Sequence, residues 1–79
     1  MATREITRSI DARGIACPGP LMALIGAIRQ AQVGDVIEVL SSDEGSKSDI
    51  PAWVEKASHE LIEIDPEDGY ARFMIRKAR

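Results

Sequence analysis

The sequence predicts one α+β domain: a two-layer sandwich in which a four-stranded mixed sheet carries two helices on one face, in the order βαβαββ. Two stretches have the apolar spacing of amphipathic helices, and four others alternate or are rich in β-branched residues. The last two strand-like stretches flank a Pro-Glu-Asp-Gly turn, which indicates a hairpin. A parallel pair joined by a right-handed crossover, then a second helix and this hairpin, gives the sandwich.

The length and composition narrow the classes of protein. The chain has 79 residues, enough for one domain over residues 1–79. One cysteine and one histidine form neither an internal disulfide nor a closed zinc site, so we expect no metal and no cofactor. No apolar run approaches the roughly 20 residues that cross a bilayer. The amino-terminal residues lack the apolar core of a signal peptide, so we expect a cytoplasmic protein without a membrane partner.

Charge is distributed unevenly along the chain. Residues 33–69 carry two lysines against eleven acidic residues, whereas residues 1–32 and 70–79 are net basic. An acidic middle between basic ends disfavours direct binding of nucleic acid. It suits a protein partner with charged surfaces.

The amino-terminal stretch, residues 3–11, is predicted as a modest strand. Ile6 and Ile10 would share one face, with Arg8 between them at a sheet edge or facing solvent. A turn follows this strand. Ile15, after the turn, is expected to tuck under the first helix and to anchor the loop from beneath.

The only cysteine lies in Cys17-Pro18-Gly19-Pro20, directly before the helical run 21–32. This pattern predicts a helix start with Cys17 at the cap, Pro18 as the first helical residue and Pro20 still in the first turn. Gly19 keeps its N–H, which we expect to stay free beside the cap side chain. A glycine between two prolines also lets the turn stay tight.

A thiolate at a helix N-terminus meets the positive end of the helix dipole and a free N–H, and both favour the charged form. Cys17 is therefore the candidate nucleophile. The alternative is that Cys17 is a small buried hydrophobic residue in a structural turn.

Two other side chains are candidates for a role beside Cys17. Met22, near the thiol, is either an apolar contact beside it or a partly exposed packing residue. His59 is expected to hydrogen-bond locally or to end a helix rather than to act as a general base.

The first helix is predicted to bury one stripe and to end at a glycine. Gly34 is the expected stop. The stripe comprises Leu21, Leu24, Ile25, Ile28 and Ala31, with Gly26, Arg29 and Gln30 off it.

The β-branched run that follows is predicted as the central strand. Ile37 and Val39 would face the helices, opposite Glu38. Val36 and Leu40 remain on the other sheet face, which two helices on one side leave uncovered. An exposed, partly apolar face of this kind favours association, so we expect a monomer or a weak oligomer.

The polar stretch 41–45 lies at the carboxyl end of this strand, where partners of open α/β sheets often bind. It is either such a contact or a solvated loop. The second helix is expected to start at residues 46–48, with Pro51 in its first turn and Trp53 in the core.

The carboxy-terminal part is predicted as a hairpin of strands 59–65 and 70–77. In its second strand, Ala71, Phe73 and Ile75 would face the core, and the basic side chains would face away from it.

Taken together, these motifs resemble the TusA, or SirA-like, sulfur carrier family, whose hallmark is Cys-Pro-x-Pro at the start of the first helix. The resemblance covers nearly the whole chain. It rests on residues 11–20, Gly34-Asp35, Asp49-Ile50-Pro51, His59-Glu60-Leu61, and Tyr70 with the closing Ile75-Arg76-Lys77.

Members of this family carry a sulfane sulfur as a persulfide on the motif cysteine, in tRNA thiolation, cofactor biosynthesis or dissimilatory sulfur oxidation. The resemblance implies this role for Cys17, in a cradle formed by Pro18, Gly19 and Pro20. It implies a sulfur-donor protein (a cysteine desulfurase, rhodanese or DsrE-like sulfurtransferase) and an acceptor protein as partners. Arg13 would steer a partner or steady the persulfide, or else be an exposed arginine without a contact.

The number of cysteines separates a carrier from other functions. A second thiol would discharge a persulfide as a disulfide, so a single cysteine favours a carrier over a dithiol oxidoreductase. The alternative function is a non-catalytic regulatory or protein-interaction module, in which the turn around Cys17 is merely structural.

Overall fold

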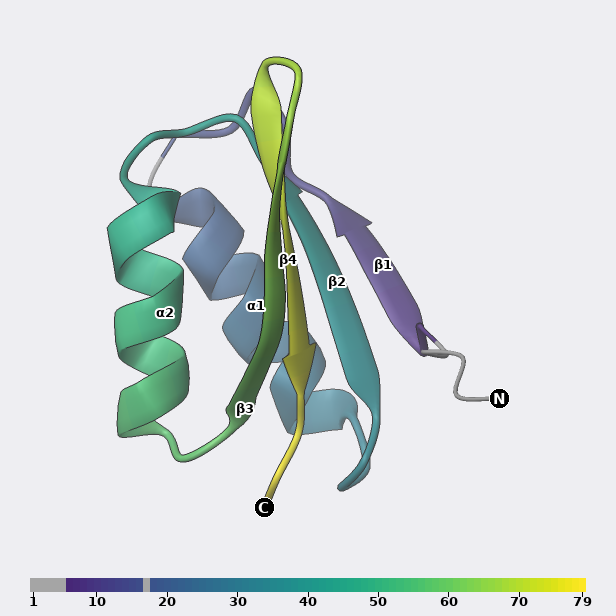
Figure 1. Ribbon diagram of the computed structural model, residues 1–79. Coiled ribbons are helices and arrows are strands. Elements are labelled where there is room, and N and C mark those ends of the chain that lie inside the picture. Colours follow the sequence, from purple (N-terminus) through teal and green to yellow (C-terminus); the bar gives the residue numbers. More distant parts are fainter. Residues whose placement is uncertain (1–5, 17) are drawn as a thin grey trace.

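The computed structural model describes residues 6–16 and 18–79. It has two layers, with both helices side by side on one face of the sheet (Figure 1), and it confirms the predicted order βαβαββ. None of the helices in the described part of the chain is long and apolar enough to cross a membrane. The elements are β1 (Arg8–Asp11), α1 (Gly19–Gln30), β2 (Val36–Ser41), α2 (Ser46–Lys56), β3 (Glu60–Glu67) and β4 (Tyr70–Arg76).

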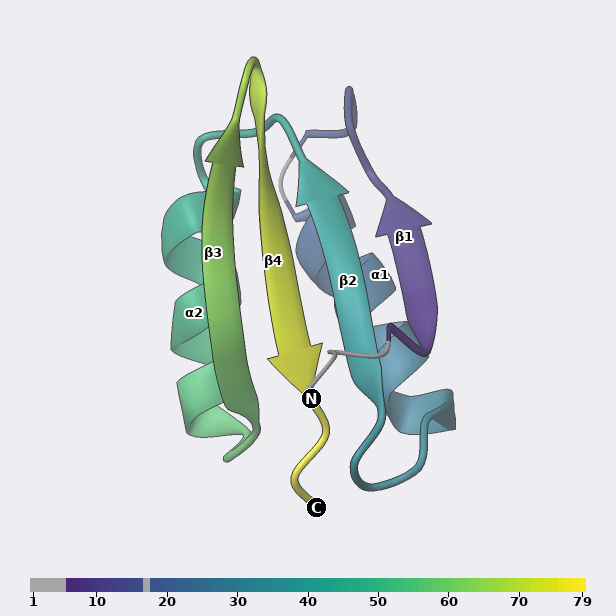
Figure 2. The same cartoon turned by 45° about the vertical axis from the view of Figure 1, so that its right-hand side comes forward.

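The strand order in the sheet is β1-β2-β4-β3, with β1 parallel to β2 and the other two pairs antiparallel (Figure 2). β1 is an edge strand, as predicted, but it is shorter than the predicted stretch: residues 6 and 7 precede it, and residues 3–5 lie outside the described part. With this topology, β1 and β2 end where α1, α2 and β4 begin (Figure 1). β3 also ends there, because Glu67 pairs with Tyr70 across the hairpin turn, so all six elements have one end at this end of the molecule.

The core fills the space between sheet and helices. Ile37 and Val39 of β2 are paired with Ile75 and Phe73 of β4, so all four side chains lie on the helix-facing side. This confirms the alternation predicted for both strands. Burial of these apolar side chains is the main stabilising contribution in so small a domain.

The predicted stripe of α1 is correct in part. Leu24 and Ile28 are buried, and the three residues predicted off the stripe are exposed. Ile25 is only half-buried, while Ala27, which the stripe did not include, is 4% exposed. Ala27 follows Leu24 by three residues and so shares its face of the helix. The prediction missed it because alanine is only weakly apolar and occurs on buried and exposed helix faces alike.

The end predicted for α1 is wrong. The helix ends at Gln30, and Ala31 takes an extended cap conformation with φ −85° and ψ 165°. Gly34 lies in the following turn with φ 97°, a left-handed conformation that favours glycine. The Nζ of Lys77 donates to the Ala31 carbonyl at 2.7 Å, so a residue after the last strand satisfies the end of the helix.

Two predictions for α2 need correction. The helix starts at Ser46 as expected, which makes Pro51 its sixth residue rather than part of its first turn. Trp53 is half-buried against the core, and its ring lies 5.6 Å from that of His59. It is therefore a border residue of the core.

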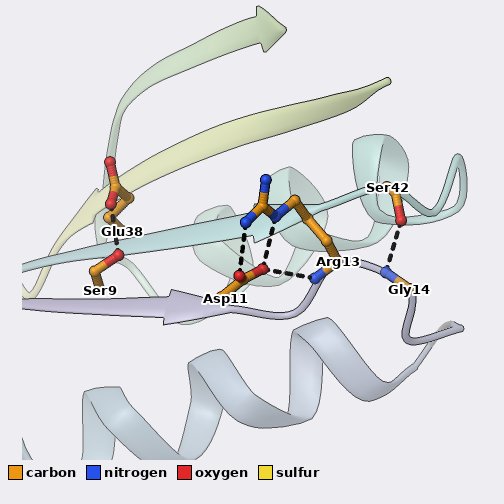
Figure 3. A network of polar contacts seen from close by, with 6 residues as sticks. All are labelled: Ser9, Asp11, Arg13, Gly14, Glu38 and Ser42. Atoms are coloured by element: carbon orange, nitrogen blue, oxygen red, sulfur yellow. Dashed lines mark hydrogen bonds and ion pairs between the residues drawn. The ribbon is translucent and has the colours of Figure 1, made fainter. Parts of the chain in front are cut away.

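The sheet face opposite the helices differs from the exposed apolar surface that was predicted. Val36 is 9% exposed and Leu40 is half-buried. Polar groups from all four strands cross this face, and we call Ser9, Glu38, Arg72 and Asp65 the polar ladder. Ser9 Oγ donates to Glu38 Oε1 at 2.6 Å (Figure 3), Arg72 Nε lies 3.1 Å from Glu38 Oε2, and Arg72 Nη2 lies 3.8 Å from Asp65 Oδ2.

Candidate functional site

The loop between β1 and α1 carries the cysteine motif. It lies at the end of the sheet where β1 and β2 finish (Figure 1). Cys17 itself lies outside the described residues, so the predictions made for its side chain stay predictions. Ala16 and Pro18, on either side of it in sequence, are both exposed. The chain on either side of the cysteine is thus at the surface.

The start of α1 is one residue later than predicted. Pro18 is the cap, with φ −96° and ψ 20°, and Gly19 and Pro20 are the first two helical residues. Met22 N–H donates to the Pro18 carbonyl at 2.9 Å. Gly19 N–H donates to the Ala16 carbonyl at 2.9 Å, so the prediction that this N–H stays free for the sulfur is wrong. The positive end of the α1 dipole remains as the local source of positive potential.

Gly19 is required by a close contact rather than by its dihedral angles. A Cβ built at Gly19 would lie 2.3 Å from Cγ2 of Ile15, far inside van der Waals distance. Ile15 is 50% exposed, so it does not tuck under the helix as predicted; its side chain lies against the Gly19 backbone instead. Pro20 is fully buried and fixes the first turn to the core.

We predict that Gly19→Ala destabilises the protein by about 1 kcal/mol, the low end for overpacking, because half-exposed Ile15 can move aside. Urea unfolding measures the free energy. The control is Gly26→Ala, also in α1, where an added Cβ meets nothing within 4 Å. That change should stabilise the helix by roughly 0.5–1 kcal/mol. Equal stabilisation by both alanines would contradict the contact with Ile15.

Arg13 makes a two-point ion pair with Asp11 in the same loop. Its Nε lies 2.8 Å from Oδ1 and its Nη2 lies 2.7 Å from Oδ2 of Asp11 (Figure 3). The Arg13 backbone N–H also donates to Oδ1, at 3.2 Å. The guanidinium lies over the ring of Tyr70, with Cζ 4.9 Å from the ring centroid. Arg13 is therefore half-exposed but held by two residues.

These hydrogen bonds change the acidity of both partners. The Arg13 side chain, and then its backbone N–H, lower the pKa of Asp11 from 3.8 to about 2. The same hydrogen bond raises the pKa of the Arg13 guanidinium. Because the pKa of Asp11 is lowered in the folded protein, the pair is complete above pH 3.8 and is lost as the pH falls through about 2.

We predict that the Asp11 carboxyl titrates near pH 2 in the wild type and moves back toward 3.8 in Arg13→Met. The carboxyl carbon shift, followed by NMR over pH 1.5–6, measures both values. Added salt should raise the wild-type pKa, because the pair is open to solvent. An Asp11 pKa that is the same in both proteins would contradict the pairing.

A second contact holds the loop from the side of β2. Gly14 has φ 83°, and its N–H donates to Ser42 Oγ at 2.8 Å (Figure 3). The sequence singled out the stretch that contains Ser42 as a place where partners could bind, but not as a support of the motif loop. Tyr70 was assigned to the predicted strand 70–77 and to the family resemblance, but not to the site. Both residues are parts of the site that sequence reasoning missed.

A pocket of about 180 Å³ lies beside this loop, between the β2–α2 connection and the β3–β4 hairpin. Four charged side chains line it, and three of them are acidic: Asp43, Glu44, Lys47 and Glu67. Lys47 is paired with Glu44 at 3.4 Å. The surface around the motif is thus built by the hairpin and the β2–α2 loop as well as by the helix tip.

His59 lies at the opposite end of the sheet, directly before β3. Its backbone N–H donates to the Val54 carbonyl at 3.0 Å, so His59 helps to end α2, which is one of the two predicted roles. Its Nδ1 accepts the N–H of Ala78, 19 residues later, at 3.1 Å, which is not a local hydrogen bond. Burial, followed by the charges of Lys77 and Arg79, lowers the pKa of His59 below 6.5. This histidine is not placed to serve the motif loop. Among residues 6–16 and 18–79, no group of three or more metal-binding side chains comes together.

Comparison with known proteins agrees with this fold and identifies a family. The family model described as sulfurtransferase TusA matches residues 8–77. A candidate sulfur carrier protein of Archaeoglobus fulgidus is 54% identical over 70 residues, which cover 89% of this chain and 96% of that protein. Sulfur carrier protein TusA of Pseudomonas aeruginosa is 33% identical over 75 residues, 95% of each chain.

Among solved structures, the crystal structure of a SirA-like protein from Desulfitobacterium hafniense is similar, with a TM-score of 0.81. It is 23% identical, and the match covers 92% of this chain and 100% of that one, so it supports the fold. The family model and the curated relatives show the family as well as the fold. The chain belongs to the TusA family of sulfur carrier proteins.

Proposed function

We propose that this protein carries a sulfane sulfur as a persulfide on Cys17 and hands it to a partner protein. The observation that supports this most is the position of the only cysteine, between two exposed residues at the start of α1. A carried sulfur must be loaded and unloaded by other proteins, so its carrier atom has to be reachable. A surface loop at a helix tip suits this requirement.

The chemistry is an exchange at sulfur. The Cys17 thiolate attacks the outer sulfur of a donor persulfide, a new S–S bond forms, and the donor's S–S bond breaks to release its thiolate. In unloading, an acceptor thiolate attacks the same outer sulfur, and Cys17 leaves as a thiolate. Each step forms one S–S bond and breaks another, so no external oxidant or reductant is needed.

The start of α1 supports this exchange in two ways. The positive end of the helix dipole favours the thiolate and the anionic persulfide. Pro18 and Pro20 restrict the backbone, and Gly19 accepts the close contact of Ile15. Together these three residues shape the cradle around Cys17.

A sulfur carrier implies a donor protein and an acceptor protein. We propose a cysteine desulfurase, rhodanese or DsrE-like sulfurtransferase as the donor, within a cytoplasmic relay for tRNA thiolation, cofactor biosynthesis or sulfur oxidation. Met22 is 60% exposed in the first turn of α1, and Ile15 is exposed in the loop before it. These two side chains offer such a partner an apolar contact beside the motif.

Intact-mass analysis tests the proposal. After incubation with inorganic polysulfide or with a loaded sulfurtransferase, each chain should gain the mass of one sulfur atom, and reductant should remove it. Cys17 is the only cysteine, so more than one persulfide per chain is not expected. A protein that gains no sulfur from either source would favour the alternative of a non-catalytic interaction module.

A further inference from the structure

Arg13 connects two strands that are not neighbours in the sheet. It follows β1, yet its guanidinium lies over the ring of Tyr70, the first residue of β4. β2 lies between these strands, and Asp11, which holds the guanidinium, is the register partner of Leu40 in β2. The Arg13 side chain therefore passes over the end of β2. We call Asp11, Arg13 and Tyr70 the strap.

The loop that contains the strap is also held by hydrogen bonds of its own backbone N–H groups. The Ala12 N–H extends the sheet by donating to the Leu40 carbonyl at 2.8 Å, and its side chain is 1% exposed. Gly14 N–H donates to Ser42 Oγ at 2.8 Å. Ile15 N–H donates back to the Ala12 carbonyl at 3.2 Å. Arg13 lies in the middle of this run, directly before the motif.

The strap is exposed, which limits what it adds to global stability. The side chains of Arg13 and Asp11 are 46% and 55% exposed. Ion pairs and cation–π contacts in solvent contribute little to the free energy of unfolding. A bidentate, stacked guanidinium does fix geometry, because its planar fork meets carboxylate and ring in one orientation. Its effect is therefore on the local order of the loop.

We propose that Arg13, held by Asp11 and Tyr70, is a positioning residue for sulfur exchange: it fixes residues 12–16 and thereby the approach to Cys17. The effect on sulfur exchange rests on the proposed function. The ordering of the loop rests only on the contacts described above. Because Tyr70 opens β4, the strap also makes the β3–β4 hairpin a support of the motif loop.

Four single variants test the strap. Arg13→Lys keeps the charge but loses the fork and the planar stack. Tyr70→Leu removes the ring face, whereas Tyr70→Phe keeps it. Arg29→Lys, at an exposed position in the last turn of α1, is the matched control for the arginine change.

Two measurements apply to each variant. The first is amide hydrogen exchange at Gly14 and Ile15, observed by NMR. The second is the rate of loading from inorganic polysulfide, in which the Cys17 thiolate takes one sulfur atom and displaces a polysulfide shorter by that atom. For Arg13→Lys and Tyr70→Leu we expect exchange about tenfold faster, from local opening, and loading slower by roughly fivefold. Tyr70→Phe and Arg29→Lys should match the wild type.

The combination of Arg13→Lys with Tyr70→Leu gives the sharpest outcome. If both residues act through one contact, the double variant loads no more slowly than either single variant. Rate losses that multiply, or unchanged exchange at Gly14 and Ile15, would overturn the inference. A fall in melting temperature as large as that of a core substitution would also overturn it. If the wild type takes up no sulfur, the proposed function fails, while the exchange data still decide whether the strap orders the loop.

Discussion

Cys17→Ser is expected to abolish sulfur loading completely and to leave the fold intact. No other side chain in the sequence can form a persulfide, because Cys17 is the only cysteine. The replacement exchanges one small side chain for another just before the cap of α1, between two exposed residues. Serine is also well tolerated at helix starts. Intact mass after incubation with polysulfide should therefore show one added sulfur on the wild type and none on the variant.

The interpretation depends on the variant being folded. Circular dichroism and the melting temperature should match those of the wild type, so that lost loading reports chemistry. Met22→Ala, at a side chain 60% exposed, should load as the wild type does from inorganic polysulfide. A reductant-sensitive sulfur on folded Cys17→Ser would rule out Cys17 as the carrier.

Phe73→Ala is expected to have the largest effect on stability. Phe73 is 0% exposed in β4, where it is paired with Val39 on one side and Ile64 on the other. Truncating a buried phenylalanine costs about 3–5 kcal/mol, through lost burial and the cavity left behind. The total free energy of unfolding of a small domain is only about 5–15 kcal/mol. The melting temperature should fall by roughly 15–30 °C, measured by circular dichroism or calorimetry.

Arg76→Ala, in the same strand, provides the comparison. Arg76 is exposed and pairs with Glu60 across the β3–β4 ladder. Exposed pairs of this kind contribute about 0–1 kcal/mol, so the melting temperature should change by only a few degrees. A Phe73→Ala variant that melts as close to the wild type as Arg76→Ala does would show that Phe73 is not central to the core.

The order of elements could be predicted because each has a strong local pattern. Ile37 and Val39 alternate with Glu38, and the hairpin turn contains Asp-Gly, whose Gly69 has φ 87°. The end of α1 could not be predicted in this way. Gly34 gives a local stop signal, but Lys77 satisfies the end of the helix from the far end of the chain. Contacts between distant residues override local propensity there.

The site shows the same division. The motif around Cys17 is visible in the sequence, because prolines and glycine at a helix start have strict backbone requirements. The hydrogen bond from the Gly19 N–H to the Ala16 carbonyl closes a turn that no residue pattern in the sequence predicts. The contact of Arg13 with Tyr70 depends on the strand order, in which β4 returns beside β2. Only the assembled sheet brings that pair together.

The polar ladder on the open sheet face bears on how a carrier travels between its partners. Stacking this face against a second copy would take Glu38 and Arg72 further from water, and desolvating charges is costly. The polar ladder therefore disfavours dimerisation through this face of the sheet, even though no helix covers it. A single chain of 8.6 kDa diffuses faster than a dimer would, which suits a protein that must meet a donor and an acceptor in turn.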